Sequence, residues 1–375
     1  MSTLAGVDRE AFAQVLRSRM RGDVRTDRIA RALYATDASP YRIEPFAVAR
    51  PAEPDDIAAV VQTCREHSVP ITARGAGTSL SGQCVGAGLQ LDLSLLDRIE
   101  SIEPEARTAR VQPGVTWWQL NRALRVHGLE FGPDPATKRQ CTLGGVVGTN
   151  AGGTHSIVYG AAVDHVRTAD AVLADGSRVT FGPTMDRLPD RLRADLLRIR
   201  DETTPLLDDR FRTLARRGSG YQLEHLCVPH PNPAKLLAGS DGTLALMTSV
   251  EVTLDELPAV RVLGVVGFPD MHAAIDAVPA LVDTSPCAVE LVSQSLLDVA
   301  RSSAFHGARV RDIDPSLGGL LFVEYQGASL AEAEAGLDRM ERVVAGAPFV
   351  GRYTDVLAAT AMWEVREAGL SLIHI

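Results

Sequence analysis

The sequence predicts an α+β protein of two or three domains, and three observations lead to this prediction. Its 375 residues allow that number at about 100–200 residues per domain. Two glycine-rich regions, 74–88 and 144–160, lie among short strand-like and helix-like segments. After Glu256-Leu257-Pro258, strand-like and helix-like segments alternate regularly, which is typical of a separate α+β domain.

The elements expected before residue 257 follow from periodicity and capping. Residues 8–34 predict helical structure, because Asp8 can cap a helix and apolar residues recur on one face. A second helix is expected from Pro54, and Thr116 with Gln119 forms a capping box that opens a third. We also expect short strands near Val48 and at 69–73, 89–93, 107–112 and 244–254, a hairpin over 171–181 that turns at Asp175-Gly176, and an arginine-rich helical lobe at 185–217.

The segment after residue 257 has its own set of expected elements. The strands are expected at 260–268, 288–292 and 320–325, and the helices at 271–282, 294–301 and 330–344. We therefore predict an N-terminal helical segment at 1–44, a larger domain at 45–256 and a second domain at 257–375. We expect that second domain to stop within an element, because no terminal cap or tail follows Gly369.

Composition and charge exclude several classes of protein. The chain is 45% hydrophobic and 23% charged, like a soluble globular protein, and its net charge of −9 disfavours general affinity for nucleic acid. The five cysteines include no pair at C-x-x-C spacing, so we expect reduced thiols and no zinc or iron–sulfur ligand set. No apolar run reaches about 18 residues, and residues 1–14 lack the apolar core of a signal peptide. We therefore expect a cytoplasmic protein without a transmembrane segment.

A glycine-rich loop at 74–83 is a candidate phosphate site. Glycines, hydroxyls and exposed main-chain N–H groups that lie together can hold a pyrophosphate. The loop differs from a P-loop, because Gln83 stands where lysine is required, and from a Rossmann fingerprint, because Leu80 stands where the third glycine is required. Taken alone, the loop could also be an ordinary surface turn.

The second glycine-rich region strengthens the ligand interpretation. Five glycines lie between residues 144 and 153, and Thr149 and Asn150 are interleaved with them. A turn that only packs a helix against a sheet would not need so many small polar residues. Two such loops, about 65 residues apart, fit one long ligand that lies between two subdomains.

Together these motifs resemble the FAD-binding domain of the vanillyl-alcohol oxidase / p-cresol methylhydroxylase (PCMH) superfamily. Within it the chain is similar to FAD-linked D-lactate, glycolate and D-2-hydroxyglutarate dehydrogenases, notably bacterial fusions of a flavin domain with an iron–sulfur domain. The resemblance covers about residues 25–370 and rests on the segments 32–39, 74–83, 132–135, 141–156, 164–166, 218–221 and 239–244. It implies a two-subdomain PCMH-type FAD-binding domain, followed by a C-terminally truncated substrate or cap domain with a ferredoxin-like antiparallel sheet.

The resemblance also implies which residues contact the cofactor. The first loop would wrap the FAD pyrophosphate, the second would line the flavin and ribityl side, and Gly242-Thr243 would close over the cofactor. Thr78 stands where some relatives carry a histidine that binds FAD covalently, so we expect non-covalent FAD. The implied cofactor residues are Arg74, Gly75, Ala76, Gly77, Thr78, Ser79, Gly82, Gln83, Pro133, Asp134, Thr142, Gly144, Gly145, Gly148, Asn150, Gly152, Thr154, Ser156, Gly242 and Thr243.

The implied reaction is oxidation of a small D-2-hydroxy acid to the 2-oxo acid, with hydride transfer to flavin N5. Arg366, in the segment 363–367, would bind the substrate carboxylate, but it could also be a surface arginine of a helix. Relatives carry the catalytic base and the metal-ligand histidines later in their chains, so we expect no metal site and slow turnover here. His155 could contact the flavin or be structural.

The implied partners are a 2-hydroxy-acid substrate and an electron acceptor. The acceptor would be a quinone, a cytochrome or an iron–sulfur domain encoded downstream, and peripheral association with the inner face of the membrane is compatible with this. Two other functions stay open. The chain could be a same-fold flavoenzyme, such as an ether-lipid synthase or a cell-wall precursor reductase, or a non-catalytic flavin-domain subunit that scaffolds a partner. The particular acid, the base and the oligomeric state do not follow from the sequence.

Overall fold

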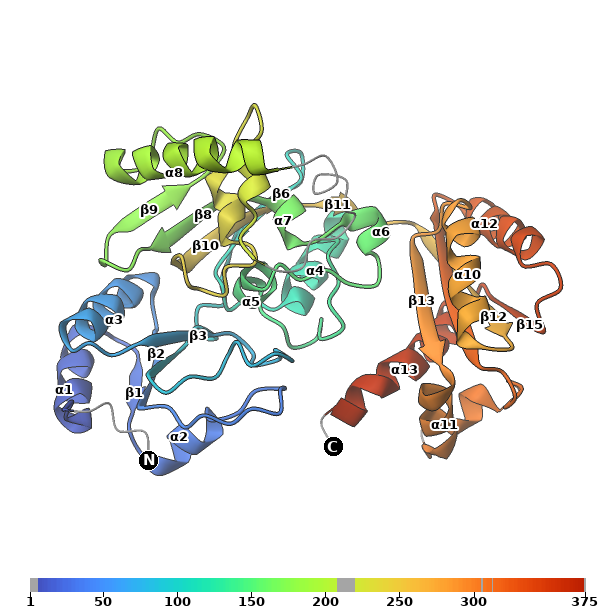
Figure 1. Cartoon of the computed structure of the whole chain (residues 1–375), viewed down its shortest axis with the longest axis horizontal. Coiled ribbons are helices and arrows are strands. Elements are labelled where there is room, and N and C mark those ends of the chain that lie inside the picture. The colour runs from blue at the N-terminus through green and yellow to red at the C-terminus, as the bar shows by residue number, and fades with distance from the viewer. Residues whose placement is uncertain (1–5, 208–219, 305, 312, 374–375) are drawn as a thin grey trace. The chain divides into compact units, whose positions relative to one another are not determined.

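The computed structural model describes residues 6–207, 220–304, 306–311 and 313–373, and the chain divides into two compact units (Figure 1). The first unit comprises Met1–Gly153 and Gly160–Glu256, and the second comprises Thr154–Tyr159 and Leu257–Ile375. Residues 208–217 of the expected arginine-rich lobe lie outside the described residues, as do Gly218 and Ser219. Among the described residues, no helix is both long and apolar enough to cross a bilayer.

The first unit combines a four-stranded sheet, a five-stranded sheet and a small two-stranded sheet with surrounding helices. Its strands are β1 (Asp23–Arg25), β2 (Ala47–Arg50), β3 (Ile71–Arg74), β4 (Leu89–Asp92), β5 (Ile99–Glu103), β6 (Thr108–Val111), β7 (Leu129–Glu130), β8 (Val166–Val172), β9 (Arg178–Phe181), β10 (Leu246–Thr253) and β11 (Asp255–Glu256). Its helices are α1 (Arg9–Arg19), α2 (Arg28–Leu33), α3 (Pro54–Glu66), α4 (Trp117–Leu124), α5 (Leu143–Gly148), α7 (Ala162–His165) and α8 (Asp190–Thr203), and its 3₁₀ turns are η1 (Arg125–His127), η2 (Thr204–Leu206), η3 (Leu223–His225) and η4 (Pro233–Leu237).

The first sheet has the order β1-β2-β4-β3 and forms one subdomain with α1 and α3. Strands β2, β4 and β3 run parallel, and β1 is antiparallel to β2. Phe12 of α1 and Ile57 and Val60 of α3 are fully buried in the same core as Leu89 and Leu91. The core closes because both helices place their apolar faces on this sheet.

The expectation of helical structure over residues 8–34 is wrong in its middle part. Helix α1 ends at Arg19, β1 follows, and Asp27 then caps α2. A side chain at Gly22 would place its Cβ 1.9 Å from the carbonyl oxygen of Arg50, so the glycine lets the chain approach β2 closely. Pairing with β2 therefore outweighs the helical pattern of the isolated segment.

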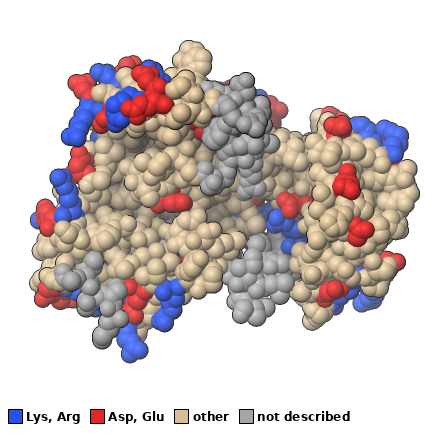
Figure 2. Space-filling view, viewed as in Figure 1, with Lys and Arg blue, Asp and Glu red and all other residues tan. Residues whose placement is uncertain are grey.

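The second sheet is antiparallel, has the order β5-β6-β10-β8-β9 and forms the other subdomain. Its core includes Leu120 and Leu124 of α4 and Val146 and Val147 of α5. Helix α8 packs Leu196 toward the same core. The exposed side of α8 mixes acidic and basic side chains (Figure 2), which include the pairs Arg193–Asp190 at 2.8 Å and Arg198–Glu202 at 3.1 Å.

The second unit is an antiparallel sheet with helices on both faces. Its strands are β12 (Val260–Phe268), β13 (Ala288–Ser293), β14 (Gly319–Gly327) and β15 (Phe349–Tyr353), in the order β13-β14-β12-β15. Its helices are α6 (Ser156–Tyr159), α10 (Met271–Val282), α11 (Gln294–Ser302), α12 (Leu330–Val343) and α13 (Val356–Ile373), and η5 (Gly307–Val310) is a 3₁₀ turn. Helices α10 and α12 share one core with the sheet, and α11 and α13 share the other (Figure 1).

This arrangement confirms the predicted fold class. The strand order is that of the ferredoxin-like β-α-β-β-α-β unit, with α11 inserted between its two middle strands. Both faces of β12 are covered, so every residue from Val262 to Phe268 is buried. Strand β15 was not expected from the sequence, and a helix around Arg366 was only one of two alternatives.

Candidate cofactor-binding site

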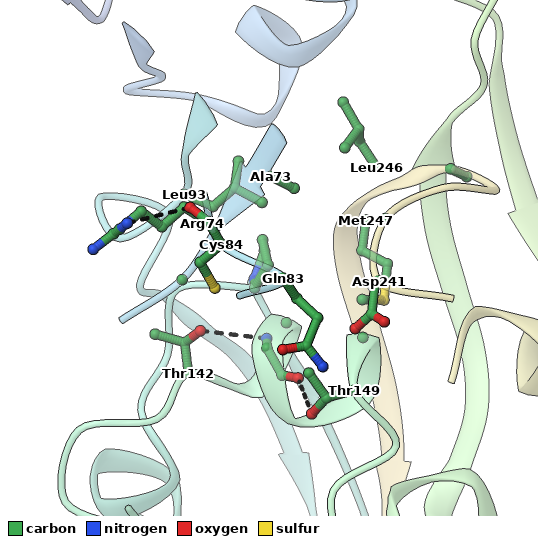
Figure 3. A pocket seen from close by; sticks show the side chains of 17 residues that line it. Ala73, Arg74, Gln83, Cys84, Leu93, Thr142, Thr149, Asp241, Leu246 and Met247 are labelled. Atoms are coloured by element: carbon green, nitrogen blue, oxygen red, sulfur yellow. Dashed lines mark hydrogen bonds between the residues drawn. The ribbon is translucent and has the colours of Figure 1, made fainter. Parts of the chain in front are cut away.

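The first unit contains a pocket that both glycine-rich loops line (Figure 3). About 590 Å³ of space in and just outside this pocket is not filled by protein atoms, and this volume includes open solvent. Three segments contribute most of its wall: the end of β3 with the loop after it, the region around α5, and the turn that leads into β10; Leu93 and Pro113 add single residues. The lining residues are Ala73, Arg74, Gly75, Gln83, Cys84, Leu93, Pro113, Thr142, Gly144, Gly145, Gly148, Thr149, Asp241, Gly242, Ala245, Leu246 and Met247.

Arg74 holds the first loop in shape. Its guanidinium donates hydrogen bonds to the carbonyl oxygens of Thr36 at 2.9 Å and Cys84 at 3.2 Å. It also lies over the ring of Tyr34, 5.3 Å from the ring centre. In Figure 3 this side chain points away from the polar ends of Gln83 and Asp241. Arg74 therefore acts mainly on the loop itself and leaves the pocket to main-chain groups and smaller side chains.

Tyr34 lies under this loop and has a strongly shifted titration. Burial, followed by a short hydrogen bond to the Asp92 carboxylate, raises the pKa of the Tyr34 hydroxyl to about 12. The side chain is therefore a neutral donor at neutral pH. It connects the N-terminal segment to the end of β4, next to the loop that Arg74 holds.

Glycines allow the two loops to approach each other. A Cβ built on Gly75 would lie 2.2 Å from the hydroxyl oxygen of Thr142, so a side chain there would force the loops apart. Thr142 caps α5 by accepting a hydrogen bond from the Gly145 amide at 3.4 Å. Gly148 does not allow a close contact of this kind, because a Cβ built there would meet no heavy atom within 4 Å. Gly148 lines the pocket, so its lack of a side chain leaves space for a ligand.

The turn before β10 completes the wall. The Asp241 amide donates to the carbonyl oxygen of Gly148 at 2.9 Å, and the Gly239 amide donates to that of Val147 at 3.1 Å. Asp241 has a left-handed backbone, with φ of 49°, and Gly242 follows at 75°. Such a conformation is costly for a residue other than glycine, asparagine or aspartate. The turn is therefore held by its bonds to α5.

Polar side chains gather at one side of the pocket. In Figure 3 the polar ends of Gln83, Thr149 and Asp241 face the same space between the loops. Burial raises the pKa of the Asp241 carboxyl above its ordinary value. These groups can accept or donate hydrogen bonds, whereas Leu93, Ala245 and Leu246 supply apolar surface. An amphipathic ligand with a polyol chain and a flat ring system matches this mixture.

The structure brings together part of the residue set implied by the resemblance. Eight implied residues line the pocket: Arg74, Gly75, Gln83, Thr142, Gly144, Gly145, Gly148 and Gly242. Ten others lie in the same unit but do not line it: Ala76, Gly77, Thr78, Ser79, Gly82, Pro133, Asp134, Asn150, Gly152 and Thr243. Thr154 and Ser156 belong to the second unit. Sequence analysis did not select Thr149 or Asp241, although Asp241 directly precedes the selected Gly242.

Several of the ten residues outside the wall have local structural roles. Asn150 has φ of 47° and accepts a hydrogen bond from the Val163 amide at 2.9 Å. The carbonyl of Pro133 accepts one from the Trp117 indole at 2.7 Å. Gly77 and Gly82 both have positive φ, at 70° and 82°, which explains why glycine is required there. These residues shape the loops that form the pocket.

Arg366 lies in the second unit on α13. Its Nη2 and Nε lie 3.0 Å and 3.2 Å from the same carboxylate oxygen of Glu290, in β13. Both side chains are partly exposed, at 25% and 23%. Arg366 therefore already binds a carboxylate within its own unit. The side chain of Glu367, which follows it in the motif, lies outside the described residues.

Two family models match the chain, one in each unit. Residues 45–182 match "FAD binding domain", and residues 257–374 match "FAD linked oxidases, C-terminal domain". The chain therefore contains an FAD-binding domain and the C-terminal domain of the FAD-linked oxidases.

Curated relatives match over most of this chain. D-2-hydroxyglutarate dehydrogenase of Escherichia coli (strain K12) is 32% identical over 327 residues, which cover 82% of this chain and 32% of the relative. D-lactate dehydrogenase of Archaeoglobus fulgidus is 30% identical over 325 residues, which cover 86% and 61%. Glycolate oxidase subunit GlcD of Bacillus subtilis is 29% identical over 350 residues, which cover 92% and 65%. This chain thus spans about a third of the first relative and under two thirds of the others.

Solved structures share the fold. p-Cresol methylhydroxylase with substrate bound superposes with a TM-score of 0.71 at 17% identity and covers 97% of this chain and 72% of its own. Alkyldihydroxyacetonephosphate synthase gives a TM-score of 0.70 at 17% identity and covers 99% and 64%. At such identities these similarities show the fold alone.

Proposed function

We propose that this chain holds FAD non-covalently in the first unit and takes part in oxidising a small D-2-hydroxy acid to the 2-oxo acid. The observation that carries the proposal is the pocket between the two glycine-rich loops, in a chain whose relatives are named D-2-hydroxyglutarate and D-lactate dehydrogenase. FAD, when bound, accepts the hydride that leaves the substrate Cα, while the hydroxyl proton passes to a base. The electrons would then pass to an acceptor such as a quinone, a cytochrome or an iron–sulfur domain.

The residues of this chain would bind and orient the cofactor. The close contact between Gly75 and Thr142 keeps both loops at the pocket, and the open space at Gly148 admits a ligand. Gln83 and Asp241 would provide hydrogen-bond partners for its polar parts. Thr78 replaces the histidine that links FAD covalently in some relatives. We therefore expect acid or heat denaturation to release free flavin, and flavin retained on the polypeptide would contradict this.

The substrate carboxylate would be bound by Arg366. Its guanidinium is already oriented by Glu290, and a planar fork suits a carboxylate better than an ammonium does. Hydrogen bonds to charged groups contribute about 1.5–3 kcal/mol, so losing them weakens binding by about one to two orders of magnitude.

The test is anaerobic bleaching of the bound flavin by D-lactate, D-2-hydroxyglutarate and glycolate in turn. We expect at least one acid to bleach the flavin slowly, because relatives carry the catalytic base later in their chains, and Arg366→Ala to raise its half-saturating concentration about 10- to 100-fold. Arg352→Ala is the matched control, because Arg352 pairs with Asp338 and Glu341 on the surface of the same unit. If no 2-hydroxy acid bleaches flavin that remains bound, the proposed reaction is wrong and another reaction of the same fold must be sought.

A further inference from the structure

Three potential metal ligands from distant parts of the sequence lie together in the second unit. They are His155 of the segment Thr154–Tyr159, Cys287 directly before β13, and Glu324 in β14. One ligand atom from each residue lies within 4.8 Å of the others. No other such group of three occurs in the part of the chain that the structure describes. No sequence pattern indicates this group, because His155 and Glu324 are 169 residues apart.

The fold brings these residues together through the sheet and α6. The Cys287 amide donates to the carbonyl oxygen of Glu324 at 2.8 Å, at the start of the β13–β14 ladder. Helix α6 follows His155 directly, and the Tyr159 hydroxyl donates to the Gln326 side chain at 3.3 Å. The position of His155 therefore depends on a second contact of the same segment with β14.

The carboxylate of Glu324 is the centre of the cluster. Its Oε2 atom lies 2.6 Å from Nε2 of His155 and 3.6 Å from Sγ of Cys287. The side chains of Glu324 and His155 are only 6% and 11% exposed, and Cys287 is 2% exposed. The three donor atoms therefore converge in a space with little access to solvent.

The surroundings of Glu324 orient it as a one-oxygen ligand. The Trp363 indole donates to Oε1 at 2.7 Å, so Oε2 is the oxygen that faces His155 and Cys287. Nε of Arg261 lies 3.9 Å from Oε2. Hydrogen-bonded carboxylates of this kind are common among metal ligands.

We propose that His155, Cys287 and Glu324 form a binding site for one divalent ion of the zinc type, with a water molecule as the fourth ligand. Nitrogen, sulfur and carboxylate oxygen are the ligands that zinc takes in proteins, at about 2.0–2.3 Å. Two such ligands of a tetrahedral ion lie about 3.3–3.7 Å apart. The separation between Sγ of Cys287 and Oε2 of Glu324 already lies in this range. The distance between Nε2 of His155 and Oε2 of Glu324 must lengthen by under about 1 Å.

Charge balance favours this assignment. Binding of a divalent cation would displace the thiol proton of Cys287, because the thiolate is the form that binds metal. A divalent ion that is bound by one thiolate and one carboxylate forms a group with no net charge. Burial of this group therefore leaves no uncompensated charge in the protein interior. The ion would also fasten the segment Thr154–Tyr159 to the sheet, and this role is independent of the proposed dehydrogenase reaction.

The test is titration of chelator-treated 375-residue protein with cobalt(II), recorded as difference spectra so that flavin absorbance cancels. We expect one cobalt per chain, a thiolate-to-cobalt charge-transfer band, and displacement of the cobalt by zinc. Cys287→Ser should abolish the band. His155→Gln and Glu324→Gln should each weaken cobalt binding at least about tenfold, in line with the loss of a ligand.

Cys64→Ala is the matched control, because Cys64 is equally buried but belongs to the first unit, and it should keep the band. Circular dichroism of each metal-free variant shows whether it folds. A test on the wild-type protein does not depend on whether a variant folds. X-ray absorption of the wild-type zinc complex should show one sulfur ligand at about 2.3 Å. A wild-type complex without sulfur, or a band that persists in Cys287→Ser, would overturn the site.

Discussion

At the scale of single residues, Gly148 offers a way to separate cofactor binding from folding. It lies in helix α5, and a Cβ there would meet no neighbouring atom within 4 Å. Alanine is favoured over glycine in helices by roughly 0.5–1 kcal/mol, so Gly148→Ala should not lower the unfolding temperature of the FAD-free protein. The methyl group would occupy the pocket, so we expect weaker FAD binding, and a further loss with Gly148→Leu.

Quenching of flavin fluorescence measures the affinity in this experiment, and thermal unfolding without FAD measures stability. Gly182→Ala is the control, because Gly182 does not line the pocket. The new Cβ would make only an ordinary contact, 3.4 Å from the methyl carbon of Thr168. Equal FAD affinities for the wild type and both Gly148 variants would show that the ligand does not approach α5.

Two buried cysteines give a prediction about pH. Burial raises the pKa of Cys64 to about 12 and that of Cys141 to about 11, against an ordinary value of about 8.5. The folded state therefore keeps protons that the unfolded chain loses above about pH 8.5. The resulting contribution to the free energy of unfolding is fully present below about pH 8.5. It is lost as the pH rises through the pKa values that the two thiols have in the folded state.

The raised pKa values of Cys64 and Cys141 should also slow the reaction of these thiols with alkylating reagents. At pH 8 we expect iodoacetamide to label Cys227, which is only partly buried, before Cys64 and Cys141, and to label all five cysteines in guanidinium. Mass spectrometry of the digested protein gives the order. Native labelling of Cys64 at the rate of Cys227 would contradict the burial of its thiol.

At the scale of elements, the capping box of α4 is a local feature with a measurable effect. The Thr116 hydroxyl accepts from the Gln119 amide at 3.1 Å, and the Gln119 side chain accepts from the Thr116 amide at 2.7 Å. Losing an N-cap costs about 1 kcal/mol, so Thr116→Ala should lower the free energy of unfolding by about that amount. Thr116→Ser keeps the hydroxyl and should stay close to the wild type in chemical denaturation. A matching loss in Thr116→Ser would show that the threonine methyl, not the cap, is responsible.

Elements with local sequence patterns were predictable, and those that depend on distant contacts were not. Helices α3, α4 and α10 and the β8–β9 hairpin match the predictions, because capping residues, Pro54 and the Asp175-Gly176 turn act within a few residues. Strand β1 was missed because its pairing with β2 involves residues far along the chain. Helix α5 was taken only as a glycine-rich region, since its glycines disfavour a helix in isolation.

At the scale of the whole molecule, net charge should influence how fast FAD binds. The chain carries −9, and FAD is itself an anion, so their encounter is repulsive at low salt. The Debye length falls from about 30 Å at 0.01 M to about 8 Å at 0.15 M salt, which screens this repulsion. We expect the association rate of FAD, measured by stopped-flow fluorescence, to rise by about twofold over that range. Riboflavin, which lacks the phosphates, is the control and should show no such rise, and a falling FAD rate would indicate a locally basic entrance.

The candidate site also contains residues that could not be predicted from the sequence, because only distant contacts bring them together. The two glycine loops were visible because their composition is unusual, and the structure brings both to one pocket. Asp241 was not selected, because its place in the wall depends on main-chain bonds to α5. The group of His155, Cys287 and Glu324 was also invisible, since no spacing in the sequence connects its members.

The assignment of Thr154–Tyr159 to the second unit has a consequence for recombining this protein with its relatives. Neither unit corresponds to one continuous stretch of gene, because six residues of the second are encoded within the first. A chimaera joined only at residue 256 would combine a foreign sheet with the native hexapeptide, and His155 would lose its contact with Glu324. Exchange of domains between homologues should therefore transfer this hexapeptide together with Leu257–Ile375.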